Sequence, residues 1–224
     1  MCIRDSSKFN SKSIILPLGD VKITRKVNSI LIIVRMNTDI EIWDQNKKRL
    51  FEEPKIEYSI RSINSLIKSI NNLRNTKFQV IAFGSWDIKL WNTPRLATIN
   101  NRSEAIKWVQ DLSAYHWDTR PSSSIKTAID DMVTDQIILL SDGIPSNSFP
   151  YCDSRGKYYI IDECLTEYNQ EKRGDTQGGK VRIDTIAVSV YGDNNDATCK
   201  FQLSSRNWFG KIASANGGKC SVIR

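Results

Sequence analysis

The sequence has little of what most catalytic and zinc centres use. It holds one histidine, His116, and its five cysteines include no C-x-x-C pair. Structural zinc sites need cysteine and histidine ligands at short, recognisable spacings, and no such spacing occurs here. No serine or cysteine stands in a nucleophile elbow with a base in reach, so we assign no catalytic residue. The chain is therefore not expected to be an enzyme.

Long apolar runs are also absent. The longest purely apolar run, Ile30 to Val34, is too short to cross a bilayer, so no transmembrane segment is expected. Met1 to Ser6 (MCIRDS) leads into polar residues, not into an apolar export signal, and resembles translated adapter sequence. We therefore treat residues 1–26 as an N-terminal segment with an artefactual start and expect one domain over residues 27–224.

Charge of one sign is not concentrated anywhere. The formal net charge is +7, but no basic block is longer than Lys47 to Arg49. This diffuse pattern favours a mixed solvated surface over a phosphate-binding face, so a nucleic-acid partner is not expected. The odd cysteine count favours the reduced cytosol as the compartment, although a bridge between Cys152 and Cys164 in an exported form stays open.

What the chain does have is an alternation of short β-branched runs with segments of helical period. The alternation predicts an α/β fold, a three-layer doubly wound (Rossmann-like) and mostly parallel sheet with helices on both faces. Strands are expected at residues 29–34, 78–83, 86–91, 136–140, 182–190 and 219–223. Helices are expected at residues 56–73, 101–112 with Asn101 as the N-cap, 121–132, 162–170 and 204–215.

The candidate site follows from this layout. In doubly wound sheets ligands bind beyond the carboxyl ends of the strands. Asp142 comes directly after the strand that ends in Leu140, and Gly143 permits a sharp turn that frees its carboxylate. Carboxylate oxygens suit Mg²⁺ or Ca²⁺, whereas Asp-Gly alone is more often a simple turn.

The stretch IILLSDGIP, from Ile137 to Pro145, and the order of elements resemble the von Willebrand factor A (VWA) family over residues 27–224. The resemblance places Asp142 on the acidic residue of the family's metal-ion-dependent adhesion site (MIDAS). It places Thr119 on the threonine of that site, just ahead of a helix. The segments at residues 80–85, 184–190 and 213–218 also look like the family's strand and helix ends.

The first motif of that family departs from its pattern here. Metal-binding members carry Asp-x-Ser-x-Ser after the first strand, and the alignment puts Arg35 on the aspartate, Asn37 on the first serine and Asp39 on the second. Arg35 is always positively charged and is expected to repel a divalent ion and to pair with Asp142. Oxygen donors for Mg²⁺ or Ca²⁺ still remain, but we expect no cofactor and favour the internal ion pair.

The resemblance implies a non-catalytic protein-interaction domain that binds a protein partner at the carboxyl-end face of the sheet. Two alternatives stay open. One is a basic nucleic-acid-binding module on the same fold, because residues 61–112 carry 8 Lys/Arg against 3 Asp/Glu. The other is a metal-dependent hydrolase, for which only Asp39 and Asp142 offer clustered carboxylates.

Overall fold

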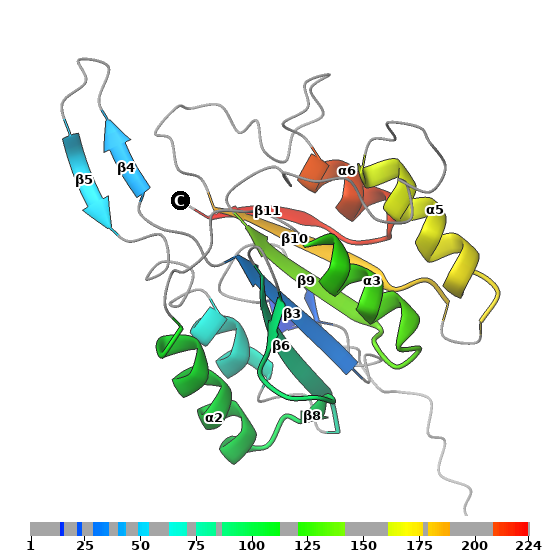
Figure 1. Cartoon of the computed structure of the whole chain (residues 1–224), viewed down its shortest axis with the longest axis horizontal. Coiled ribbons are helices and arrows are strands. Elements are labelled where there is room, and N and C mark those ends of the chain that lie inside the picture. Colours follow the sequence, from blue (N-terminus) through cyan, green and yellow to red (C-terminus); the bar gives the residue numbers. More distant parts are fainter. Residues whose placement is uncertain are drawn as a thin grey trace, which may run out of the picture.

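The fold is known from a computed structural model, which describes residues 14–15, 22–23, 29–35, 40–43, 49–53, 63–70, 75–83, 87–112, 121–141, 161–176, 179–188 and 208–223. Its centre is a seven-stranded sheet (Figure 1). The strand order is β11 (Cys220–Ile223), β10 (Arg182–Val188), β9 (Gln136–Ser141), β3 (Ser29–Arg35), β6 (Lys77–Phe83) and β7 (Asp87–Lys89), with β8 (Arg95–Leu96) also on β6.

Most of this sheet is parallel, as the sequence predicts. The pairs from β11 to β6 all run parallel, and β7 and β8 both run antiparallel to β6. Every residue of β9 is buried, which is what a central strand covered on both faces requires. The continuous apolar runs of the sequence therefore became the inner strands.

Helices cover both faces of the sheet (Figure 1). A helix at residues 63–69 and α2 (Ile99–Gln110) pack over one core, which includes Ile138 and Leu140 of β9. The second core includes Ile137 and Leu139 and lies under α3 (Ser122–Asp130), α5 (Ile161–Arg173) and α6 (Trp208–Ala215). Alternate residues of one strand thus serve opposite cores, which confirms the three-layer, doubly wound prediction.

The helix predicted at residues 101–112 begins earlier than expected. Its N-cap is Thr98, whose side chain accepts a hydrogen bond from the Asn101 backbone N–H at 3.2 Å, so the prediction that Asn101 is the cap was wrong. Asn101 instead donates its side-chain amide to the Leu96 carbonyl at 2.8 Å. The first turn of α2 is mostly exposed, and apolar periodicity carries no information about such a turn.

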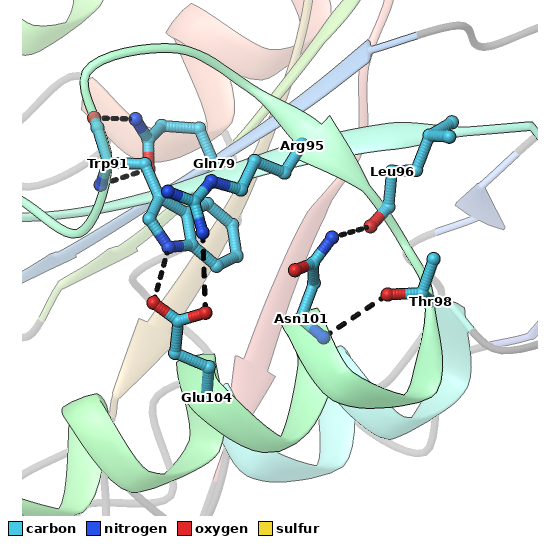
Figure 2. Close-up of polar contacts among 7 residues, drawn as sticks. All are labelled: Gln79, Trp91, Arg95, Leu96, Thr98, Asn101 and Glu104. Atoms are coloured by element: carbon cyan, nitrogen blue, oxygen red, sulfur yellow. Dashed lines mark hydrogen bonds and ion pairs between the residues drawn. The ribbon is translucent and has the colours of Figure 1, made fainter.

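Hydrogen bonds among Gln79, Trp91 and Glu104 hold the segment between β7 and α2 against the sheet (Figure 2). Trp91 is 5% exposed, and its ring meets the Phe78 ring edge to face with centroids 5.2 Å apart. Its Nε1–H donates to Glu104 at 2.8 Å, and Arg95 approaches the same carboxylate at 3.4 Å. The Gln79 side chain hydrogen-bonds the backbone of Trp91 through both its amide oxygen and its amide nitrogen.

Two small antiparallel sheets are formed in addition to the main one. The sequence did not predict β4 (Ile40–Trp43) and β5 (Arg49–Glu53), which pair with each other and project beside the main sheet (Figure 1). The other sheet joins β1 (Ile14–Ile15) to β2 (Lys22–Ile23) within residues 1–26. The division at residue 27 stays a prediction.

The end of α6 shows why two consecutive glycines stop this helix. Gly217 has φ +69, the left-handed conformation that glycine adopts at low cost. A Cβ on Gly218 would lie 1.9 Å from the Ile183 carbonyl oxygen of β10. Both glycines are therefore needed for the chain to turn from α6 into β11.

Among the described helices, none is long and apolar enough to cross a membrane.

Candidate functional site

The carboxyl ends of β3 and β9 lie side by side in the middle of the sheet. The strands are parallel neighbours with Val34 in register with Leu140, so Arg35 and Ser141, their last residues, stand at the same edge. Strand β6 is the next strand of the main sheet after β3 in the sequence, and it lies beside β3. Strand β10 follows β9 and lies beside β9, on the opposite side of the pair. Ligands of doubly wound sheets bind where the strand order reverses in this way. This edge is the candidate functional site.

Most of the predicted site residues fall outside the part of the chain that the structure describes. These are Asn37, Asp39, Thr119 and Asp142. Their described neighbours do stand at the carboxyl edge, since Asp142 follows the buried Ser141 and α3 begins shortly after Thr119. Arg35 is described as the end of β3, in register with Phe83 of β6. The contacts among the predicted site residues therefore stay predictions.

A carboxylate that the sequence reasoning missed lies at the same edge. Asp87, in β7, is in register with Phe83, and its Oδ2 accepts a hydrogen bond of 2.5 Å from the Ser123 hydroxyl in the first turn of α3. The N-cap of α3, Pro121, makes no side-chain cap, and the first turn has no acidic residue. A carboxylate stabilises the partly positive N-terminus of a helix. No motif marks Asp87, because only strand pairing brings it to α3.

Comparisons with known proteins identify the fold. No family model and no curated protein matches the sequence. A solved structure of a von Willebrand factor type A protein from Catenulispora acidiphila matches with a TM-score of 0.57 at 16% identity, over 91% of this chain and 40% of that chain. BatB, a conserved hypothetical protein from Bacteroides thetaiotaomicron, matches with a TM-score of 0.54 at 14% identity, over 87% and 89% of the two chains.

This chain has the von Willebrand factor A fold. The VWA resemblance noted in the sequence is thus confirmed for the fold, and at these identities the likeness shows the fold alone. The chain spans less than half of the Catenulispora protein but nearly all of BatB. None of these structures supports the nucleic-acid alternative.

Another structure with the VWA fold raises the question of a metal. Proximal thread matrix protein 1 from the mussel byssus, with a zinc-occupied MIDAS motif, matches with a TM-score of 0.50 at 13% identity, over 87% of this chain and 43% of that chain. In the described part of the present chain, no group of three or more His, Cys, Asp or Glu side chains could hold a metal ion.

Two buried oxygen atoms near the carboxyl edge of the sheet bear on the same question. Asp87 Oδ1 and the hydroxyl of Ser124, a residue with 0% exposure, have no hydrogen-bond partner. Buried groups of this kind often contact water or an ion. One carboxylate and two serine hydroxyls fall short of the six or more oxygens that Ca²⁺ takes, and the N-terminus of α3 disfavours a cation. The described residues at this edge therefore do not form a Ca²⁺ or Mg²⁺ site by themselves.

An ionic cluster lies at the other end of α3. The carboxylate of Asp130, the last residue of α3, accepts hydrogen bonds of 2.5 Å from both Lys126 and the Tyr168 hydroxyl of α5. Burial raises the pKa of Asp130, but the bonds from Lys126 and Tyr168 outweigh it and leave this pKa below its usual value. The bond to Asp130 likewise raises the pKa of Lys126. This cluster joins two helices, so its role is structural.

Proposed function

We propose that this chain is a non-catalytic protein-interaction domain whose partner binds at the carboxyl edge of β3 and β9. The observation that carries the proposal is the reversal of strand order between these two strands, with Asp142 directly after the buried end of β9. Loops on a rigid sheet commonly carry recognition. The VWA fold supports this placement, and the absence of a nucleophile paired with a base in the sequence supports a non-catalytic role.

The chemistry proposed for this edge is an ion pair between Arg35 and Asp142. The guanidinium of Arg35 supplies the positive charge that a bound cation supplies in a metal-occupied site of this kind. It also offers several N–H donors to a carboxylate. Asn37, Asp39 and Thr119 then serve as hydrogen-bonding groups toward the partner. Mg²⁺ or Ca²⁺ coordination by Asp142, Thr119, Asn37 and Asp39 is the competing arrangement.

The binding proposal is tested with matched carboxylate variants. Asp142→Ala removes the proposed binding residue, whereas Asp175→Ala removes an exposed carboxylate in the turn after α5, at the opposite edge of the sheet. We expect wild type and Asp175→Ala to capture the same proteins from an extract of the source organism, in similar amounts by quantitative mass spectrometry. Asp142→Ala should capture these proteins in amounts at least tenfold lower.

Equal capture by all three forms would show that the partner binds elsewhere. A fold control is needed, because an ion pair broken on one side also lowers stability. Circular dichroism and the unfolding midpoint of Asp142→Ala should therefore be measured beside the capture experiment. Turnover of an ester or phosphoester that depends on Asp142 would contradict the non-catalytic role.

A further inference from the structure

Both cysteines that lie within the described residues are oxidised. Cys164 in α5 and Cys220, the first residue of β11, are disulfide-bonded. Cys164 is 1% exposed and belongs to the core under α3, α5 and α6, and Cys220 packs against the same core. Cys164 therefore lies within the packing of one side of the sheet, and the half-buried Cys220 lies at the margin of that packing.

Their position indicates a structural role. Thiol–disulfide exchange requires a thiolate to reach a sulfur atom, and the sulfur of the buried Cys164 is protected from that attack. Catalytic redox pairs commonly use a C-x-x-C spacing with an accessible, acidic thiol, and the sequence has no such pair. Neither Cys164 nor Cys220 fits a redox-active centre.

A network of uncharged side chains joins α5 to the end of α6, just before β11. Asn169 of α5 donates to the Asn216 side chain at 2.8 Å, and Asn216 in turn donates to Thr166 at 3.1 Å and to the Ile212 carbonyl at 2.9 Å. None of these three hydrogen bonds uses a cysteine. Oxidation therefore adds covalent stability to a region that packs well, and reduction is expected to weaken it without destroying its secondary structure.

We propose that the oxidised form is the native one and that this domain folds in an oxidising compartment, outside the reducing cytosol. Stable disulfides persist where glutathione and thioredoxin do not reduce them. Disulfides use cysteines in pairs, so a chain with five cysteines keeps at least one thiol even when the others are oxidised. The odd cysteine count, which favoured the cytosol, is therefore no evidence against oxidation. The proposal is independent of partner binding, because it rests on different residues.

Thiol labelling tests it directly. The chain is produced in a bacterial periplasm, denatured without reductant, alkylated, and mapped by mass spectrometry. We expect the peptides that contain Cys164 and Cys220 to stay unlabelled until a reductant is added. Complete labelling of both cysteines before reduction would overturn the proposal, whatever the outcome of the capture experiment.

Thermal unfolding gives the second measurement. Losing a native disulfide from a domain of this size is expected to lower Tm by about 5 to 15 °C when dithiothreitol is added. The double variant Cys164→Ser, Cys220→Ser is the matched control, since its Tm should start low and should no longer respond to dithiothreitol. If this variant fails to fold, the labelling result still decides. An unchanged Tm of the wild type under reduction would contradict the proposal.

Discussion

At the scale of single residues, Met132 stands out by its backbone conformation. It follows α3 directly after the C-cap Asp131 and has φ 58, in the left-handed region that glycine adopts most easily. The Asp131 carboxylate holds this turn by accepting from the backbone N–H groups of Val133 and Thr134, each at 2.9 Å. The Met132 side chain is 54% exposed, so little packing offsets the strain.

Replacement of Met132 by glycine should stabilise the protein. The left-handed conformation costs about 1 kcal/mol or more for a residue with a Cβ, and the greater freedom of glycine in the unfolded chain takes back part of the gain. We expect a net gain of roughly 0.5 kcal/mol in the free energy of unfolding, measured by urea titration. Val133→Gly, next to it and equally exposed, is the control and should lower stability.

At the scale of elements, α3 and α5 are joined by the cluster around Asp130. Tyr168 is 3% exposed and brings its hydroxyl from α5 to the end of α3. The side chains of Lys126 and Asp130 are each 38% exposed, so water screens much of their attraction. The hydrogen bond from the buried Tyr168 is therefore expected to contribute more than the ion pair.

Asp130→Asn should lower the free energy of unfolding by about 1 kcal/mol at neutral pH, the size of one hydrogen bond to a charged group after screening. The folded-state pKa of Asp130 lies below the usual value of 3.8. Its stabilisation is therefore present above pH 3.8 and is lost as the pH falls through the lower, folded-state pKa.

The difference in stability between wild type and Asp130→Asn should accordingly shrink as the pH falls from 6 toward about 2.5 in urea titrations. The same titrations of Asp175→Asn, which removes an exposed carboxylate after α5, serve as the control. A difference that stays constant over this range would mean that the ionised carboxylate of Asp130 contributes nothing.

Most elements of the main sheet could be predicted, and the exceptions have a common cause. The apolar runs at residues 29–34, 78–83 and 136–140 match β3, β6 and β9 closely, because strands buried on both faces leave a strong pattern. The sequence did not predict the β4–β5 hairpin, and it placed the start of α2 too late. Local pairing and capping determine both, and these leave only weak traces in hydrophobic periodicity.

At the scale of the whole molecule, the topology explains why a short motif could locate the candidate site. Strand order reverses between β3 and β9, so the ends of both strands meet at one edge even though over one hundred residues separate Arg35 from Ser141 in sequence. The motif around Asp142 directly follows one of these strand ends. Asp87 reaches the same edge through antiparallel pairing of β7 with β6, which no motif records.

The same topology makes metal binding measurable as whole-molecule stability. A cation held by loops from different strands binds the folded chain alone and must raise its Tm. With an ion pair between Arg35 and Asp142, the Tm of the wild type should be the same, within about 1 °C, in EDTA, Mg²⁺, Mn²⁺ or Ca²⁺.

Arg35→Asp should behave differently, since it restores a carboxylate beside Asp142 and removes the competing positive charge. We expect this variant to be less stable than wild type in EDTA, because two carboxylates then repel each other, and to regain several degrees in millimolar Mg²⁺ or Mn²⁺. Arg35→Asp combined with Asp142→Ala is the control and should not respond to metal. Stabilisation of the wild type by metal, lost in Asp142→Ala, would instead show that Asp142 coordinates a cation despite Arg35.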